Sequence, residues 1–169
     1  TLVSSLLALT QPFCAERKTV DLQLWLEERR TAFAEAAQAK DVRIILAIEP
    51  QLPAGAKGLA LFDPVQMARV FDNLLLNALA HTSEQGEVEL GARRTRRGAL
   101  LLWVADDGCG IPVELREMLF EPFATTRAGG TGLGLALVRE IVQGHGGRVS
   151  LAKSAKGTRI EMELPWPEY

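Results

Sequence analysis

The chain has 169 residues, of which 47% are hydrophobic and 24% are charged, a composition typical of one globular domain with a real core. Its formal net charge of -2 gives no indication of affinity for nucleic acid or a membrane surface, and we expect neither partner. Two cysteines are too few for a disulfide framework, and no apolar run reaches membrane-span length. These features favour a cytoplasmic location.

The first half of the chain predicts helices on either side of a strand. Residues 1–10 carry apolar side chains at helical spacing, like the last turns of a helix. Asp21 can cap a second helix, whose apolar face continues to Ala37. Residues 42–49 alternate between apolar and charged side chains and predict a strand, and a second, shorter strand is expected near residues 58–62.

The second half predicts two hairpins and two further long helices. The expected elements are a helix from Asp63-Pro64 to about Thr82, a hairpin of strands 87–94 and 99–105, a short helix after Pro112, a helix from about Leu133 to Gly144, and a closing hairpin of residues 148–154 and 158–164. This order of elements predicts an α/β fold. We expect a two-layer sandwich in which one mixed β-sheet carries helices on one face.

A polar seam follows the helix predicted after Asp63. Asn73, Asn77 and His81 recur every four residues on a helix that is otherwise apolar almost all round. A buried amide without a partner costs about 1–3 kcal/mol. The seam therefore either bonds to neighbouring backbone or faces a cleft that holds something polar, and an amide oxygen is a ligand that Mg²⁺ accepts beside phosphate oxygens.

Two acids follow the second strand of the central hairpin, in the stretch ADDGCGIP of residues 105–112. A carboxylate at a strand end, beside backbone opened by Gly108 and Gly110, can accept hydrogen bonds from an exocyclic amine such as that of adenine. The alternative is a tight turn with two solvated acids, and the local sequence does not distinguish the two.

Glycines cluster in GGTGLGLALV, residues 129–138, and lead directly into a helix. A P-loop would need a Lys after its last glycine, and a dinucleotide fingerprint would need a preceding strand, so neither motif fits. Bare N–H groups at a helix start nevertheless attract phosphate. Upstream, Phe120 and Phe123 could anchor the base of a loop, and Thr125, Thr126 and Arg127 could offer hydroxyls and a cation to phosphate.

In combination, these motifs resemble the N, G1, F and G2 boxes of the ATP-binding catalytic domain of bacterial sensor histidine kinases. The pattern is N-x-x-x-N, D-x-G-x-G, F-x-x-F and G-x-G-x-G, in that order, and the resemblance covers about residues 20–165. It implies the Bergerat fold of the gyrase, heat-shock chaperone, histidine kinase and mismatch-repair ATPase superfamily, with ATP between the sheet-covering helices and a mobile lid.

The resemblance also implies roles for individual residues. Asp106 would bind the adenine amino group, Asn77 would hold Mg²⁺, and Asn73 and Arg127 would act at the phosphates during transfer. The other residues expected to bind the nucleotide are His81, Gly108, Gly110, Phe123, Thr125, Thr126, Gly130, Thr131, Gly132, Leu133 and Gly134. The segment from about Ala124 to Thr131 would form the lid, whose glycines allow closure and a close approach of phosphate to the backbone.

Two departures from the family pattern stand out. Many members carry a Lys or Arg where this chain has Ala80, which leaves Arg127 as the expected cation near the γ-phosphate. The lid is also short, like that of the nitrogen-regulation and flagellar-regulation branch.

The function implied is transfer of the ATP γ-phosphate to a histidine. Neither His81 nor His145 fits the acceptor, so we expect it on a dimerisation domain that precedes Thr1, with residues 1–19 as helix tail and linker and residues 20–169 as the catalytic domain. The implied partners are that domain and a response regulator, in a larger homodimeric sensor that is either cytoplasmic or membrane-associated. Alternatives are a gyrase- or chaperone-type ATPase, which needs a Glu where Asn73 stands, an anti-sigma-factor serine kinase, and a module that no longer binds ATP.

Overall fold

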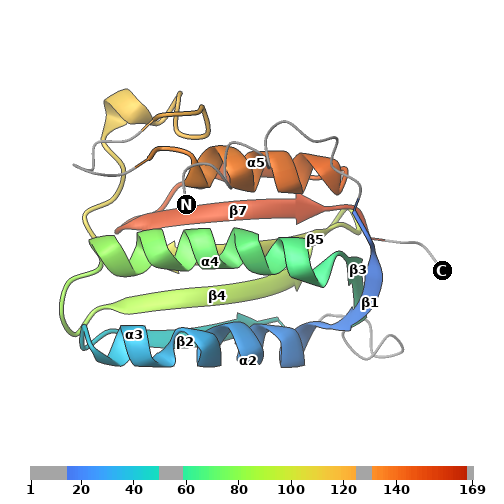
Figure 1. The fold of residues 1–169 in the computed structure, drawn as a ribbon, viewed down its shortest axis with the longest axis horizontal. Helices are drawn as coiled ribbons and strands as arrows, with labels where there is room; N and C mark the ends of the chain where they lie inside the picture. The colour runs from blue at the N-terminus through green and yellow to red at the C-terminus, as the bar shows by residue number, and fades with distance from the viewer. Residues whose placement is uncertain (1–14, 50–58, 125–130, 167–169) are drawn as a thin grey trace.

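The computed structural model describes residues 15–49, 59–124 and 131–166 of the chain, and these residues form a two-layer α/β sandwich (Figure 1). The main sheet has five strands in the order β2 (Arg43–Ile48), β4 (Glu87–Arg94), β5 (Leu100–Asp106), β7 (Thr158–Leu164) and β6 (Arg148–Leu151). The pair β2–β4 is parallel and the other neighbouring pairs are antiparallel. This mixed sheet confirms the fold class predicted from the sequence.

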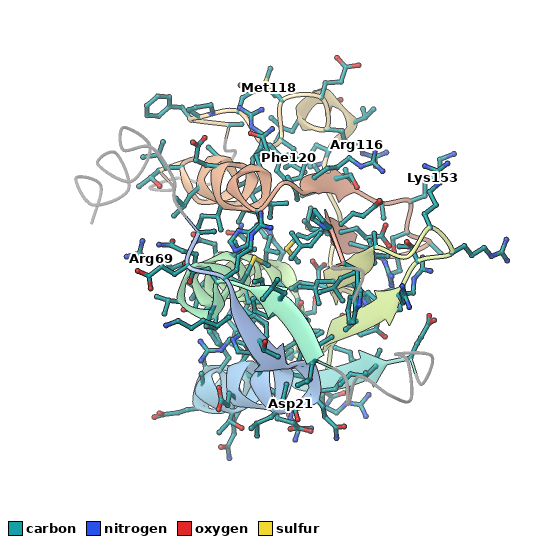
Figure 2. All side chains as sticks on the ribbon, turned by 90° about the vertical axis from the view of Figure 1, so that its right-hand side faces the viewer. Asp21, Arg69, Arg116, Met118, Phe120 and Lys153 are labelled. Carbon is teal, nitrogen blue, oxygen red and sulfur yellow. The ribbon has the colours of Figure 1, made fainter. Side chains whose placement is uncertain are left out.

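Three long helices cover one face of the sheet. They are α2 (Leu22–Ala32), α4 (Pro64–His81) and α5 (Gly134–Gly144). Figure 2, which looks along the layers, shows the helices on one side and the strands of the main sheet on the other. No helix within the described ranges is both long and apolar enough to cross a membrane.

A small second sheet lies at one end of the helices and was not expected. Strand β1 (Lys18–Asp21) pairs antiparallel with β3 (Leu59–Phe62), the short strand predicted near residues 58–62. The four residues of β1 carry one buried side chain, Val20, so their pattern is too short to predict a strand. Asp21 ends β1 and caps α2, because its Oδ1 accepts a hydrogen bond of 3.1 Å from the Leu24 amide (Figure 2).

Two helical predictions differ from the structure. The helix expected from Asp21 to Ala37 is divided at Phe33, so that α2 is followed by the short α3 (Ala34–Gln38). Phe33 packs against the core at the break, and neither Gly nor Pro marks the position in the sequence. After Pro112 the chain makes only a 3-10 turn, η1 (Val113–Leu115), in place of a short helix.

The long helix α4 begins as the sequence predicts. Asp63 is its N-cap, with Oδ1 accepting hydrogen bonds of 3.0 Å from the amides of Val65 and Gln66, and Pro64 occupies the first turn. Its buried side chains contribute to the main core and are Met67, Val70, Phe71, Leu74, Leu75, Ala78 and Leu79. Burial on several sides leaves the polar seam as the face that can hold a ligand.

His145 joins the start of α4 to the end of α5. The side chain is 2% exposed, and its Nε2 accepts a 3.0 Å hydrogen bond from the Asp63 amide. The ring proton therefore sits on Nδ1, which donates to the Ile141 carbonyl at 2.8 Å. Arg17 donates to the His145 carbonyl at 3.0 Å, and the Glu16 amide donates to Asp63 Oδ2 at the same distance. We call this set of five residues the helix junction.

The helix junction predicts a pH dependence of stability. Burial lowers the pKa of His145 below its usual 6.5, so the unfolded chain binds more protons near that pH than the folded chain does. The free energy of unfolding should therefore be highest above pH 6.5 and decrease as the pH falls below it. Urea titrations at a series of pH values measure this slope.

The chain has only one other histidine, which provides a matched control. His81→Asn should leave the slope between pH 7.5 and about pH 5.5 in place, whereas His145→Asn should flatten it and lower stability by about 1–3 kcal/mol. An unchanged slope in His145→Asn would show that another group titrates.

Candidate functional site

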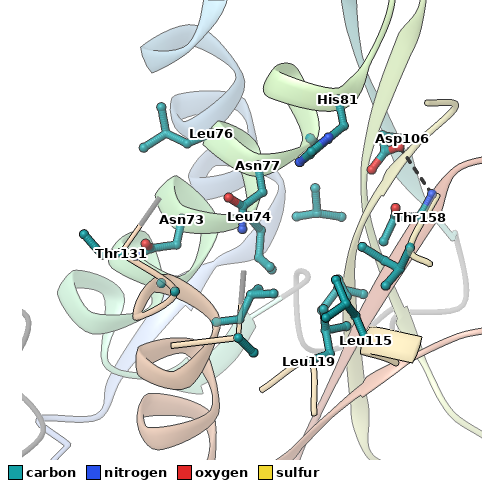
Figure 3. A pocket seen from close by; sticks show the side chains of 18 residues that line it. Asn73, Leu74, Leu76, Asn77, His81, Asp106, Leu115, Leu119, Thr131 and Thr158 are labelled. Atoms are coloured by element: carbon teal, nitrogen blue, oxygen red, sulfur yellow. Dashed lines mark hydrogen bonds between the residues drawn. The ribbon is translucent and has the colours of Figure 1, made fainter. Parts of the chain in front are cut away.

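The polar seam of α4 faces a cavity and is not bonded into the core. Asn73, Asn77 and His81 lie one after another along the helix and line a cavity of about 320 Å³ (Figure 3). Asn73 donates from Nδ2 to the Arg69 carbonyl at 2.8 Å, which leaves its carbonyl oxygen to accept. Of the two alternatives left open by the sequence, the structure therefore supports the seam as the wall of a cleft.

Asp106 lies on the opposite wall, at the end of β5 (Figure 3). Its Oδ1 accepts hydrogen bonds from the amides of Gly108 at 2.9 Å and Thr158 at 3.3 Å. Burial raises the pKa of Asp106 above its ordinary value, although these hydrogen bonds and the charge of His81 act in the opposite direction. Both backbone bonds go to one oxygen, so Oδ2 remains to accept from a ligand.

The neighbouring carboxylate, Asp107, bonds to other parts of the chain. Its Oδ1 accepts from the Glu87 amide at 3.0 Å and its Oδ2 pairs with Lys156 Nζ at 2.9 Å. The Glu87 hydrogen bond, followed by the contact with Lys156, lowers the pKa of Asp107. Of the two acids, one therefore faces the cavity and the other joins the end of β5 to the start of β4 and to the turn before β7.

The cavity has an apolar end and a polar end. On the side of Asp106 the wall is mainly apolar: Val104 and Ile160 pair across β5 and β7 two residues from Asp106 and Thr158, and Leu115 lies nearby, while Asn73, Asn77 and Thr131 line the other end (Figure 3). A flat heterocycle with one amine suits the first environment, because apolar walls cover its faces and a carboxylate accepts from its edge. The second environment suits a strongly hydrated, charged group.

The glycine-rich stretch approaches α4 closely. An added Cβ at Gly134 would lie 2.8 Å from Asn73 Oδ1, so a side chain at this helix start would require Asn73 to move. Gly132 has a φ of +64°, and an added Cβ there would lie 2.5 Å from the Phe123 carbonyl carbon. The Phe123 amide also donates to the Gly132 carbonyl at 2.9 Å. These glycines therefore serve backbone packing as well as any approach to phosphate.

The predicted binding residues fall into three groups. Those that line the cavity are Asn73, Asn77, His81, Asp106, Thr131, Gly132 and Gly134. Those that lie outside the lining are Gly108, whose amide holds Asp106, Phe123, whose amide bonds to Gly132, and Gly110 and Leu133. Thr125, Thr126, Arg127 and Gly130 lie outside the described residues, as does most of the expected lid.

Phe123 differs from its predicted place. We expected Phe120 and Phe123 to anchor the loop together, but only Phe120 packs against the core, and Phe123 is 65% exposed with a φ of +68°. The left-handed backbone at Phe123 turns its side chain away from the core, and the spacing of the two residues gives no sign of this turn.

Sequence reasoning missed Thr158, which both lines the cavity and holds Asp106. The two residues face each other across β5 and β7, and the Thr158 hydroxyl also contributes to stabilising the ionised Asp106. In the sequence, the only local sign of this role is that Thr158 begins the last strand, directly after Gly157. Its contact with Asp106 depends on the register of β5 and β7, which brings together residues 52 positions apart.

The cavity provides part of a metal site. Within the described ranges, no group of three or more His, Cys, Asp or Glu side chains converges on one point. Asn77, whose side chain points into the cavity, forms no hydrogen bond with another described residue (Figure 3). One neutral oxygen ligand fits Mg²⁺ that is held mainly by phosphate and water, and it does not fit a metal bound by protein alone.

Comparison with known proteins places this geometry in context. A model of the histidine kinase-, DNA gyrase B- and HSP90-like ATPase family matches residues 62–168. The alginate biosynthesis sensor protein KinB of Pseudomonas aeruginosa is 39% identical over 153 residues, which are 89% of this chain and 25% of KinB. The sensory histidine kinase/phosphatase NtrB of Azospirillum brasilense is 35% identical, over 89% of this chain and 40% of NtrB. The chain thus spans well under half of these relatives.

A solved structure has a fold similar to that of this chain. Full-length ShkA in complex with AMPPNP matches with a TM-score of 0.85 and 26% identity, over 99% of this chain and 36% of ShkA.

The contact between Gly132 and Phe123 generates a prediction about stability. Gly132→Ala should lower the free energy of unfolding by about 1–3 kcal/mol, because it combines a positive φ with a backbone clash. Gly98→Ala is the matched control, since its φ of +83° is similar but the nearest atom to the new Cβ is 3.4 Å away in the Arg94 side chain. Urea unfolding should show the larger loss for Gly132→Ala; equal losses would mean that the clash relaxes.

Proposed function

The chain belongs to the family of histidine kinase-, DNA gyrase B- and HSP90-like ATPases, and from this membership we propose that it is the ATP-binding catalytic domain of a sensor histidine kinase. The sensor-kinase relatives support that choice within the family. Because the chain spans only 25% and 40% of these two relatives, the activity of the whole protein is part of the proposal.

The observation that carries the proposal is the position of Asp106 at the apolar end of the cavity. Its Oδ2 would accept from the exocyclic amine of adenine, while the apolar side chains cover the base. Thr158 and Gly108 hold the carboxylate through the other oxygen. Guanine has a carbonyl in place of that amine, so the same carboxylate would reject GTP.

The polar end of the cavity would receive the phosphates. Asn77 would supply one ligand to Mg²⁺, which when bound neutralises phosphate charge. Asn73 would face the phosphates from one turn earlier on α4. Arg127 would be the cation near the γ-phosphate in place of the Lys or Arg that Ala80 replaces, and Thr125, Thr126 and Gly130 would contribute further contacts from the lid.

Transfer to a protein acceptor is favoured over hydrolysis by the character of Asn73. A hydrolase needs a base to take a proton from water, and an amide cannot do this. An imidazole acceptor needs no such base, because its nitrogen is itself the nucleophile. The domain then contributes positioning and charge neutralisation, which dominate phosphoryl transfer.

The acceptor histidine would lie outside this chain. His145 is buried in the helix junction, where both ring nitrogens are engaged, and His81 is fixed on the helix that forms the cavity wall. We propose that the acceptor belongs to a dimerisation domain that precedes residues 1–19, and that a response regulator receives the phosphoryl group. The proposed boundary at residue 20 falls inside β1.

The first functional prediction concerns nucleotide affinity. Asp106→Ala should weaken ATP binding about 10- to 100-fold, since it removes a hydrogen bond to a charged group worth about 1.5–3 kcal/mol. Glu114→Ala, which removes an exposed carboxylate from the neighbouring 3-10 turn, should bind ATP like the parent. Calorimetry in Mg²⁺ measures both, and equal affinities for Asp106→Ala and the parent would refute the assignment of Asp106.

The second prediction concerns the pH dependence of the same affinity. Only the ionised carboxylate of Asp106 accepts well, and burial raises its pKa, so ATP affinity should fall as the pH decreases toward that raised pKa. Asp106→Asn separates this effect from protonation of the nucleotide itself. The Asp106-dependent part of the pH profile should be absent from that variant, and an identical profile would contradict the role.

The third prediction concerns phosphoryl transfer. With γ-labelled ATP and Mg²⁺ the chain alone should stay unlabelled, because neither histidine can reach the γ-phosphate in line. The dimerisation domain of the full-length protein, added in excess, should acquire an acid-labile label. Asn77→Ala is the control and should reduce that labelling. Stable label on a hydroxyl of the chain would instead support a serine kinase, and rapid phosphate release without transfer would support an ATPase.

A further inference from the structure

Strand β2 is one edge of the main sheet, and within the described residues the backbone groups on its outer side are unpaired. β2 pairs only with β4, in parallel register, and no other described element pairs with it. The Arg43 amide donates to the carbonyl of Gly86, just before β4, and the Glu49 amide donates to the Ala92 carbonyl in β4, each at 3.0 Å. Since backbone groups alternate along a strand, those of Ile44, Leu46 and Ile48 point to the open side.

The two edges of the sheet differ in how they are protected. The opposite edge, β6, is four residues long and alternates Arg148 and Ser150 with apolar residues. β2 is six residues long, RIILAI, with five consecutive apolar residues that are only half-buried and with no Pro, Lys or bulge. Edges with this character pair readily with another strand, and proteins normally avoid them.

The sequence of this edge is complementary to itself. In an antiparallel pairing of two copies centred on Leu46, Ile44 lies opposite Ile48 and Leu46 opposite Leu46. These are the residues whose backbone groups point outward, so they would form the hydrogen-bonded pairs of the ladder. We propose that a second copy of this chain docks on β2 in this register, joining two five-stranded sheets into one.

The charges at the two ends of β2 agree with this register. The same alignment places Arg43 of each copy opposite Glu49 of the other, in pairs whose side chains approach closely. Both residues lie at the surface and now make peripheral ion pairs, Arg43 with Glu87 at 3.1 Å and Glu49 with Arg93 at 4.0 Å. A shift of the pairing by two residues in either direction would lose one outward-facing pair and separate these charges.

The faces of the strands also match. Ile44, Leu46 and Ile48 pack on the helix side of the sheet, against the core. Residues directly opposite each other in an antiparallel pair share a face, so these three meet their counterparts on that side while Arg43 and Glu49 meet on the open face. The pairing adds few buried side chains, so the dimer is weak and forms at high protein concentration or where two copies are held together.

Sedimentation equilibrium without nucleotide tests the proposal, and its result does not depend on ATP binding. The parent chain should change from monomer to dimer as its concentration rises toward the millimolar range. At the same concentrations, amide exchange followed by NMR should slow at Ile44, Leu46 and Ile48 and stay unchanged at Ile45 and Ala47, which already face β4. A monomer at every concentration, or slowing at both sets of amides alike, overturns the proposal.

Charge reversal tests the register itself. Arg43→Glu and Glu49→Arg should each weaken dimerisation about tenfold, because each replaces two attractive cross-strand pairs by two repulsive ones. The double variant Arg43→Glu/Glu49→Arg should regain the parent dimer, although its ion pairs with Glu87 and Arg93 remain broken. Thermal unfolding of each monomer checks that the fold is retained.

The opposite edge provides the matched control. Arg148→Glu breaks a surface ion pair with Glu163 whose distance, 3.1 Å, equals that of the Arg43–Glu87 pair. This variant should leave dimerisation unchanged. Dimerisation that is insensitive to Arg43→Glu, that is not restored in the double variant, or that is lost equally in Arg148→Glu overturns the assignment to β2.

Discussion

The buried contact between His145 and Asp63 fixes the two helices that frame the cavity. Asp63 caps α4 with its carboxylate and donates its own amide to the imidazole, so the start of α4 and the end of α5 are joined through one pair of residues. The helices run in opposite directions, and the cavity lies at their other ends, about 15 Å along α4. Burial of a neutral imidazole is tolerated because both of its nitrogens have partners. Residues 16 and 17 attach the incoming chain at the same point.

At the end of β5, two adjacent acids have different environments and different roles. Asp106 turns toward the cavity, and desolvation raises its pKa; Asp107 turns outward to an amide and a lysine, and its pKa falls. Alternation along a strand puts neighbouring side chains on opposite faces, so one residue can serve the ligand while the next holds the scaffold. The cavity therefore has a carboxylate at its apolar end without a second negative charge beside it.

The face of the main sheet opposite the helices is covered by side chains of the sheet itself. Trp103 lies over Gly91, where any larger residue would occupy the space of the indole ring, and Arg159 stacks on that ring at 4.3 Å from its centroid. Trp103 is 3% exposed as a result, although none of the described helices lies on this side of the sheet. The strands thus present a charged outer layer across the middle of the sheet, and the least protected part of the sheet is the half-buried edge strand β2.

Local patterns in the sequence determined most of the elements and the residues of the cavity. The cap at Asp63, the alternation in β4 and β7, and the four-residue spacing of Asn73 and Asn77 depend on neighbours within a turn or a strand. Tertiary structure decided the break at Phe33, the pairing of β1 with β3, the outward turn of Phe123, and the contact of Thr158 with Asp106. The β1–β3 pair and the contact of Thr158 with Asp106 join residues far apart in the chain, whose register is set when apolar faces pack together, and no short-range pattern records that choice.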